Sequence, residues 1–324
     1  MIKCFVICAL LAIMTGTSRA AQPEWPFVLA DLLNGPPSTD ASPPTDPAPD
    51  SSNSCDQVTF SRNLKYGEND LNVLDVATGD IKDATPRPVL LFVAGESFAG
   101  VGTTGAAGNG QDKAPQDTTL QDKAMCFAAR NGMVGVSMTY RMAPAAGWPA
   151  GARDVAAAAS WIHQNIDLFK GNAQEIVAIG YAAGAFHVAS FLAHTEIQES
   201  DSNVAGAVLV SGIYHSSSDA GEDEKSYFGT DASKYDERSA LPGLLKVGVP
   251  IVLAWSAQDT PRLITQAEKL KALLCGAEHC PRTKILDKRE NSLASAYGLD
   301  DGTDPNLADP TLQLVREIET RGLP

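Results

Sequence analysis

The sequence is short of basic side chains and has no long apolar run after its first twenty residues. It carries 25 lysines and arginines against 39 aspartates and glutamates, for a formal net charge of −14. A surface of this sign repels the phosphates of nucleic acids and anionic lipids, so we expect neither as a partner. A membrane-spanning helix needs about 20 consecutive apolar residues. The sequence therefore argues against a membrane span.

The first twenty residues, MIKCFVICALLAIMTGTSRA, predict a signal peptide. Lys3 precedes an apolar centre, and the small residues Ser18 and Ala20 are placed for cleavage before Ala21. The apolar centre is too short to span a bilayer comfortably. We therefore expect an exported protein, either secreted or periplasmic.

Residues 21–54 are expected to precede the folded domain. Residues 35–54, GPPSTDASPPTDPAPDSSNS, are mainly Pro, Ser and Asp, and bury too little apolar surface to order themselves. Just before them, residues 23–35 (PEWPFVLADLLNG) can form a short apolar helix. This helix either packs against its own domain, which is the simpler interpretation, or binds a protein partner on a flexible tether.

Cysteine is also scarce, and only four cysteines remain once the signal peptide is removed. An even number in an oxidising compartment favours disulfides. Cys275 and Cys280, in CGAEHC, are close enough in sequence to pair, which leaves Cys55 for Cys126. His279 between two cysteines raises the alternative of a zinc site, but one C-x4-C pair without a second ligand cluster is weak evidence for it. We expect two disulfides, no resident metal ion and no cofactor.

Apolar strand patterns and helix patterns alternate from residue 56 onward. QVTFSRNLKYG and LNVLDVA predict an antiparallel hairpin at the start. Further strands are expected over 87–95, 133–140, 175–181, 205–212, 250–259 and 282–288, and helices over 119–132, 152–169, 185–194, 264–274 and 309–320. This order predicts an α/β domain over residues 55–324, with a mostly parallel central sheet of about eight strands and helices on both faces. Ligands of such sheets bind beyond the carboxyl ends of the strands.

Three segments resemble those of known hydrolases. They are NGMVGVSMTYRMAPAAGWPAGARDVAAAASWI, GYAAGAFHVASFLAH and YFGTDASKYDERSAL. In this order they resemble the carboxylesterase branch of the α/β-hydrolase fold, in particular the hormone-sensitive-lipase-like esterases, over about residues 57–320. The resemblance implies a segment that roofs the site, about residues 213–247, and a Ser-Asp-His triad.

The triad that this resemblance implies is incomplete. Its acid is present as Asp259, at the end of IVLAWSAQD, although an aspartate there also suits a helix N-cap. Ala182 takes the nucleophile's place in G-x-S-x-G, and a methyl group cannot form an acyl-enzyme. The base belongs in the loop after the last strand, RENSLASAYGLDDG, where Ser292 aligns best with its position. His279 precedes that strand and is expected at the opposite edge of the sheet.

The loop expected to form an oxyanion hole also departs from the His-Gly-Gly that the resemblance implies, because it reads Ala-Gly-Glu. Backbone N–H groups make such a hole, so Gly95, Glu96 and Ala183 remain candidate donors. An inward Glu96 carboxylate would repel the oxyanion. GESFAG also resembles the elbow of serine carboxypeptidases and offers Ser97 as a displaced nucleophile. The four glycines that follow show no helical period, so we interpret this match as a coincidence.

These substitutions leave several hypotheses about function. A laboratory Ser→Ala change would explain Ala182 alone, and neither the missing histidine nor the altered His-Gly-Gly. The second hypothesis is an active ester hydrolase with a non-standard site. An oxyanion hole and substrate binding, without a triad, can retain about 10³ to 10⁴-fold rate enhancement over water. We favour a third, a pseudohydrolase that binds a small apolar or ester-like ligand above Ala182 without cleaving it. A protein-interaction module that uses residues 23–35 is the competing hypothesis.

Overall fold

The computed structural model describes residues 55–95, 97–99, 118–218, 220–286, 292–297, 299 and 305–321. All of these belong to one compact unit, Pro49–Pro324, which is distinct from the unit Met1–Ala48. The predicted signal peptide, residues 1–20, and the predicted segment 21–54 lie outside the described residues and stay predictions.

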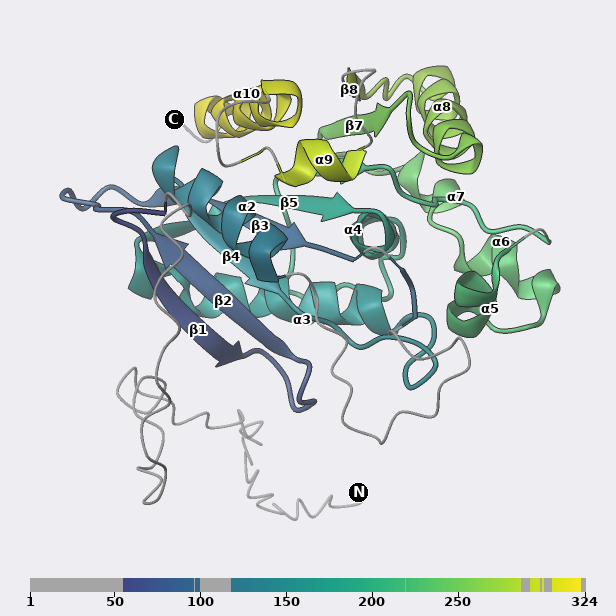
Figure 1. The fold of residues 1–324 in the computed structure, drawn as a ribbon, viewed down its shortest axis with the longest axis horizontal. Helices are drawn as coiled ribbons and strands as arrows, with labels where there is room; N and C mark the ends of the chain where they lie inside the picture. Colours follow the sequence, from purple (N-terminus) through teal and green to yellow (C-terminus); the bar gives the residue numbers. More distant parts are fainter. Residues whose placement is uncertain are drawn as a thin grey trace, which may run out of the picture. The chain divides into compact units, whose positions relative to one another are not determined.

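A single eight-stranded sheet forms the centre of this unit (Figure 1). Its strands are β1 Thr59–Lys65, β2 Val73–Thr78, β3 Arg87–Val93, β4 Val134–Met138, β5 Gly171–Tyr181, β6 Gly206–Val210, β7 Ile251–Ser256 and β8 Arg282–Leu286. They lie in the order β1-β2-β4-β3-β5-β6-β7-β8, where β2 is antiparallel to β1 and β4, and all later pairs are parallel. The predicted mostly parallel sheet of about eight strands is confirmed.

Helices cover both faces of the sheet because its parallel strands are apolar on both sides. Along β3, Leu91 and Val93 face one apolar cluster while Leu90 and Phe92 face the other. The first cluster includes residues of α3 Ala150–Asn165, α4 Ala183–Ala193 and α8 Pro261–Gly276. The second includes residues of α2 Thr118–Arg130, α9 Ser292–Tyr297 and α10 Pro305–Arg321.

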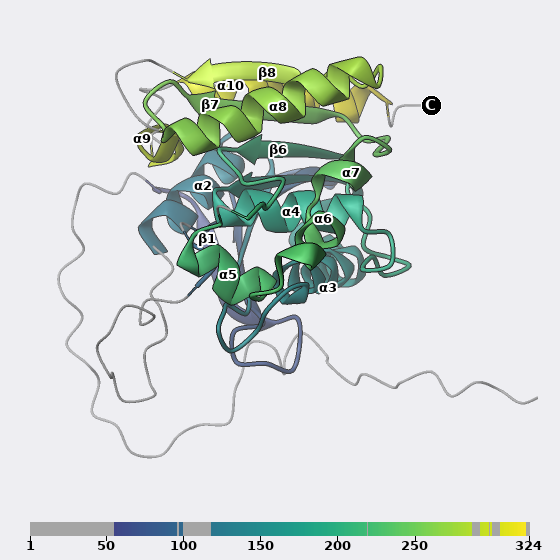
Figure 2. The ribbon, with the colours of Figure 1, turned by 90° about the vertical axis from the view of Figure 1, so that its right-hand side faces the viewer.

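The segment expected to roof the site folds into short helices. They are α5 Glu222–Phe228, η2 Ala232–Lys234, α6 Tyr235–Arg238 and α7 Leu241–Leu244. A further turn, η1 Ile166–Phe169, follows α3. The roof lies beside α4, at the edge toward which β5 points (Figures 1 and 2). Phe228 and Tyr235 of the roof share the apolar cluster of Phe186 in α4, so the roof is packed onto the elbow helix.

The chain after β8 was expected to be a loop, and this expectation is wrong for Ser292–Tyr297, which form α9. Two buried residues, Ala296 and Leu299, anchor this short helix and its end in the second apolar cluster. The backbone N–H of Ser292 is bonded to a carboxylate of Asp259, which caps the helix from a distant part of the chain.

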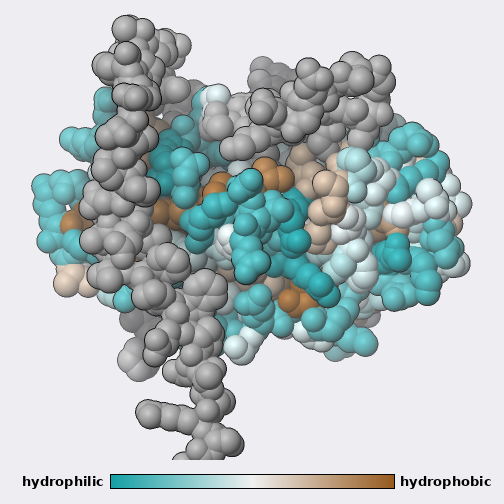
Figure 3. Space-filling view, turned by 90° about the horizontal axis from the view of Figure 1, so that it is seen from below, coloured by the Kyte–Doolittle hydropathy of each residue, from teal (hydrophilic) through white to brown (hydrophobic). Residues whose placement is uncertain are grey.

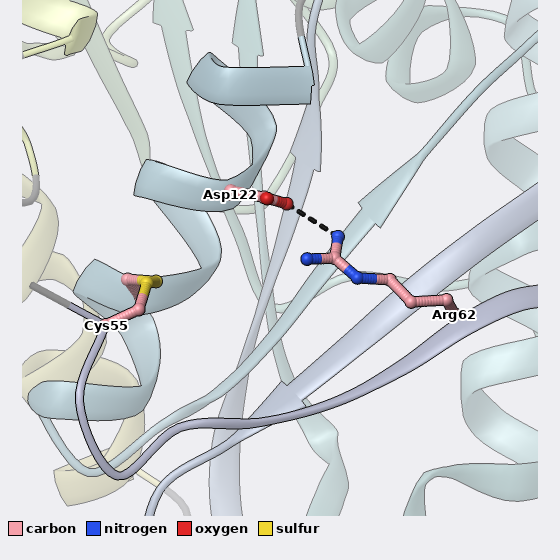
Figure 4. Close-up of a disulfide and its surroundings, with 4 residues drawn as sticks. Cys55, Arg62 and Asp122 are labelled. Carbon is pink, nitrogen blue, oxygen red and sulfur yellow. Dashed lines mark hydrogen bonds and ion pairs between the residues drawn. A yellow bond between two sulfur atoms is a disulfide. The ribbon is translucent and has the colours of Figure 1, made fainter. Parts of the chain in front are cut away.

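Two disulfides tie down surface segments of the domain. Cys55 pairs with Cys126 of α2 at a Cα–Cα distance of 5.7 Å, and Cys275 pairs with Cys280 at the end of α8. Near the first bridge, Arg62 of β1 reaches Asp122 of α2 at 2.6 Å (Figure 4). The covalent bond and the ion pair therefore both hold α2, one through Cys55 before β1 and the other through Arg62 within β1.

The described surface has few exposed apolar residues. Leu168, Leu273 and Ile285 are the large hydrophobic side chains exposed among the described residues. The face seen in Figure 3 is mostly hydrophilic, with small separate brown spots among its coloured residues. Among the described residues, no helix combines the length and the apolar character needed to cross a membrane.

Candidate functional site

The turn from β5 into α4 keeps the backbone of a nucleophile elbow (Figure 1). Ala182, at the tip, has φ 50° and ψ −113°, a conformation that residues with a Cβ adopt only when their surroundings impose it. The glycines of the motif let the helix approach the sheet. A Cβ on Gly184 would lie 1.9 Å from the carbonyl oxygen of Val93, and one on Gly180 would lie 2.6 Å from the next helix backbone. The elbow is therefore built as in a hydrolase, with a methyl group at its tip.

Ser211, at the end of β6, lies beside the elbow. The Ala182 N–H donates to the Val210 carbonyl at 2.9 Å, and Ser211 follows directly. Ser211 also has a positive φ, 50°, and is 1% exposed. Its N–H is bonded to Ala254 of β7 at 2.9 Å. The hydroxyl of Ser211 thus stands between the elbow and the turn that carries the acid.

The Asp259 carboxylate is held by three donors of the protein. One oxygen, Oδ2, accepts from the Ser211 hydroxyl at 2.5 Å and from the Ser256 N–H at 2.9 Å. The other, Oδ1, accepts from the Ser292 N–H at 2.9 Å. In a triad the same carboxylate would accept from an imidazole N–H. Here its bonds connect the ends of β6 and β7 to the first residue of α9.

Ser292, the residue aligned with the base, is 2% exposed and begins α9. The structure brings it to Asp259, as the alignment requires, but through its backbone N–H. Sequence reasoning missed Ser211, whose signal is faint. It is a serine followed by glycine at the end of an apolar strand, a pattern that also ends many ordinary strands.

The candidate oxyanion-hole donors are only partly in view. Glu96 lies outside the described residues. The Ala183 N–H donates to the Gly95 carbonyl at 2.9 Å, so this donor is already used within the protein. Beneath the loop lies the hydroxyl of Tyr140, since a Cβ on Gly95 would be 1.8 Å from its oxygen. Burial raises the pKa of that hydroxyl above its ordinary value, which keeps it protonated.

Ser97, the displaced nucleophile weighed above, is committed to the roof. Its hydroxyl donates to Asp223 of α5 at 2.5 Å and accepts from the Ala99 N–H at 3.2 Å. A carboxylate alone is a weak base for a serine hydroxyl, and no imidazole is bonded to Ser97 among the described residues. These contacts assign Ser97 to linking the loop after β3 to α5.

No imidazole is bonded to Asp259 in the part of the chain that the structure describes. His187 of α4 is buried beneath the roof, packed edge-on against Tyr140 and Tyr227. Desolvation lowers the pKa of His187 to about 3, so the ring is neutral. His194 pairs with the Glu196 carboxylate at 3.0 Å. These contacts give both histidines a structural role.

Comparison with known proteins agrees with this architecture. Residues 81–219 match the family model BD-FAE. Esterase LipC of Mycobacterium tuberculosis (strain ATCC 25618 / H37Rv) is 31% identical over 162 residues, which cover 47% of this chain and 36% of LipC. The chain has the α/β-hydrolase fold, and residues 81–219 are similar to esterase-like members of that fold. The aligned part spans about a third of the length of LipC, so the activity of that whole protein does not transfer by itself.

Solved structures of esterases share the fold of this chain. Esterase B from Lactobacillus rhamnosis, inhibited by a C4-C4 tributyrin phosphonate, superposes with a TM-score of 0.67 at 14% identity, over 82% of this chain and 87% of the other. A truncated carbohydrate esterase from gut microbiota gives a TM-score of 0.63 at 15% identity, over 81% and 96%. At these identities the likeness is one of fold.

The site geometry departs from what esterase chemistry requires of an α/β hydrolase. A nucleophile, a base and free oxyanion donors must converge on one carbonyl. Here the tip of the elbow is Ala182, the carboxylate is bonded to protein donors, and the Ala183 N–H is internally paired. Among the described residues, no three His, Cys, Asp or Glu gather in a way that would hold a metal ion.

Proposed function

We propose that the protein is a pseudohydrolase, which binds a small apolar or ester-like ligand over the elbow and does not cleave it. The observation that carries this proposal is the bonding of Asp259. Its carboxylate accepts from Ser211, Ser256 and Ser292, so the group that would orient a catalytic histidine serves instead to join three segments. Ala182 supports the proposal independently, because it has no atom that can attack a carbonyl.

The ligand class follows from what surrounds the elbow. Tyr181, Ala182 and Leu286 belong to the apolar cluster on one side, and Phe98 and Ile213 belong to the cluster on the other. Tyr181 and Ala182 of the turn itself pack in the second cluster and Ala183 in the first, and such apolar surroundings favour a ligand with an acyl or alkyl group. The phosphonate-inhibited Esterase B, which has the same fold, suggests short-chain esters as the first compounds to test.

Weak ester hydrolysis is the second candidate, and the retained elbow favours it. Ala182 keeps a strained φ of 50°, and Gly184 still fits closely against β3. A site that keeps this geometry can bind an ester in a reactive orientation, with a rate far below that of a complete triad.

Hydrolysis of short-chain p-nitrophenyl esters by the purified chain tests the proposal. We expect the native chain to match the uncatalysed rate and an Ala182→Ser, Ser292→His variant to turn over. The structure adds a third change, Ser211→Ala, because the Ser211 hydroxyl occupies the oxygen that an imidazole would need. The triple variant should be faster than the double variant, and Ala182→Ser alone should stay silent.

The outcome that contradicts inactivity is ester turnover by the native chain at ordinary enzymatic rates, and Ser97 would then be mutated next. Binding is measured separately, by equilibrium dialysis of an uncleavable ether analogue of p-nitrophenyl butyrate. An Ala182→Trp variant, which fills the space over the elbow, should abolish it. If native and Ala182→Trp chains bind the ether equally, the proposed ligand site is wrong.

We also propose export of the protein with cleavage between Ala20 and Ala21, and this proposal is supported by the paired cysteines. Cell fractionation and N-terminal sequencing test it; recovery of an uncleaved chain in the cytosol would contradict it. A partner role for residues 23–35 is tested by deletion, and capture of the same partner by the shortened chain would rule it out.

A further inference from the structure

A cavity of about 420 Å³ lies at the edge of the sheet opposite the elbow. Ile251 and Arg282, the first residues of β7 and β8, line it, together with Leu314 and Arg321 of α10. Because β5, β7 and β8 run parallel, their amino ends lie a strand length away from Ala182. The cavity is therefore separate from the proposed ligand site.

The charge of this cavity is opposite to that of the chain. Two arginines, Arg282 and Arg321, line it together with His279, and none of its described lining residues is acidic. The whole chain has a formal net charge of −14. A concave site with cationic groups in an otherwise anionic surface concentrates the field on one small region and attracts an anion there.

Two of these side chains have no partner within the part of the chain that the structure describes. Neither the His279 ring nor the Arg321 guanidinium makes a hydrogen bond or ion pair within the described part of the chain. Arg282 is held by Glu317 of α10, which fixes the position of its guanidinium. A guanidinium has five N–H donors in a planar fork, so donors remain for a carboxylate.

The floor of the cavity is apolar. Val252, Leu274 and Leu314 are at most 1% exposed, and Ile251 is 8% exposed. Val247 and Val249, which also line the cavity, are only partly buried, so an inorganic anion would leave these two side chains in contact with water. A ligand that covers Val247 and Val249 with hydrocarbon gains the free energy of apolar burial as well.

The walls are built from constrained backbone. The Cys275–Cys280 disulfide closes the turn after α8, and the His279 N–H donates to the Leu274 carbonyl at 2.9 Å. Pro250 and Pro281 stand just before β7 and β8. Constrained walls lower the entropy that is lost when a ligand binds.

We propose that this cavity binds a small carboxylate with an apolar tail, such as a medium-chain fatty acid or an arylalkanoate. The carboxylate lies between the guanidinium groups of Arg282 and Arg321, and the tail lies on Val247 and Val249. The volume is near the lower end of the range found for small-molecule sites, which limits the ligand to one small molecule.

Calorimetric titration of the full-length, disulfide-bonded chain tests this proposal. Octanoate should bind, whereas acetate has the charge without the tail and 1-octanol has the tail without the charge, so each should bind at least about tenfold more weakly. Inorganic phosphate separates simple anion binding from the proposed chemistry and should also bind at least tenfold more weakly. Equal binding of phosphate and octanoate would overturn the proposal.

Variants locate the binding. Arg321→Gln and Arg282→Gln should each weaken octanoate binding by about tenfold or more, because each removes a charged hydrogen bond. Arg316→Gln is the matched control on the same helix, since Arg316 does not line the cavity, and should leave binding unchanged. Thermal unfolding of every variant checks that it is folded.

The proposed ligand site over the elbow could also accept octanoate, and two results distinguish the sites. Octanoate binding in the cavity beside α10 should survive Ala182→Trp and should be lost in the Arg282→Gln, Arg321→Gln double variant. If octanoate binding instead disappears with Ala182→Trp and persists in the double variant, the ligand belongs to the elbow and the proposal for this cavity is wrong.

Discussion

Replacement of Asp259 by alanine should destabilise this protein, although in a complete triad its first effect would be on catalysis. The Asp259 carboxylate accepts from the hydroxyl of Ser211 and from the N–H groups of Ser256 and Ser292. Removal leaves all three donors without their acceptor, and one of them is the N-terminal N–H of α9. Loss of a helix N-cap alone costs about 1 kcal/mol.

The magnitude follows from these bonds. A hydrogen bond to a charged group contributes about 1.5 to 3 kcal/mol, but Asp259 is half-buried and water replaces part of each lost bond. We therefore expect Asp259→Ala to lower the free energy of unfolding by about 3 kcal/mol. Asp259→Asn keeps one acceptor oxygen and turns an amide toward a donor, so about 2 kcal/mol is expected.

Urea unfolding followed by circular dichroism measures these changes. Asp70→Ala is the matched control, because that carboxylate is 97% exposed, and it should change stability by less than about 0.5 kcal/mol. If Asp259→Ala is as mild as the control, the carboxylate does not hold these segments together. In a double-mutant cycle, Ser211→Ala should lose most of its own effect once Asp259 is alanine.

Three further changes test other parts of the fold. Gly184→Ala should destabilise by about 2 kcal/mol, because its Cβ would meet the carbonyl of β3, whereas Gly276→Ala, in open space, should be neutral in the same urea titration; equal effects would contradict the packing. Desolvation lowers the pKa of His187 to about 3, below its value of about 6.5 in the unfolded chain. The folded protein therefore has its full stability above pH 6.5, and its free energy of unfolding falls by about 2 kcal/mol by pH 5, because the unfolded chain takes up a proton that the folded one does not. His187→Phe should remove that part of the pH dependence, and an unchanged pH profile would show that the ring is hydrated. Changing Cys55 and Cys126 together to alanine frees a loop of 71 residues and should cost about 4 kcal/mol in non-reducing thermal unfolding; a loss below about 1 kcal/mol would mean that the bridge does not form.

The sheet could be predicted because its strands are apolar runs bounded by turn residues. β3, β6 and β7 lie inside their predicted ranges. β5 begins at Gly171 rather than residue 175, because its first residues are only partly buried and carry no apolar run. The apolar pattern of a sequence predicts the buried part of a strand. Backbone hydrogen bonds extend β5 beyond that part, and the sequence carries no sign of them.

The contacts of the site could not be predicted, because they join residues far apart in the sequence. Ser211 and Asp259 are 48 residues apart, and Ser292 lies 33 residues beyond Asp259. Helix α9 spans six residues, too short for a helical period to be recognised, and its cap comes from another turn. The sequence also suggested Asp259 as the N-cap of the helix that follows it, α8. That helix is capped by Thr260 instead, and Asp259 caps α9.

The strained backbone at Ala182 bears on how easily this molecule could change its chemistry over generations. Alanine and serine codons differ by one base, and the turn already holds φ 50° and ψ −113°, so a hydroxyl would arrive in a position prepared for it. The histidine is a much longer step, because its place is now the capped start of a helix and the oxygen it needs is bonded to Ser211. Gain of a nucleophile therefore requires one mutation, whereas gain of a base requires the segment after β8 to be rebuilt. A descendant that gains ester hydrolysis would be expected to begin with a serine that lacks its histidine.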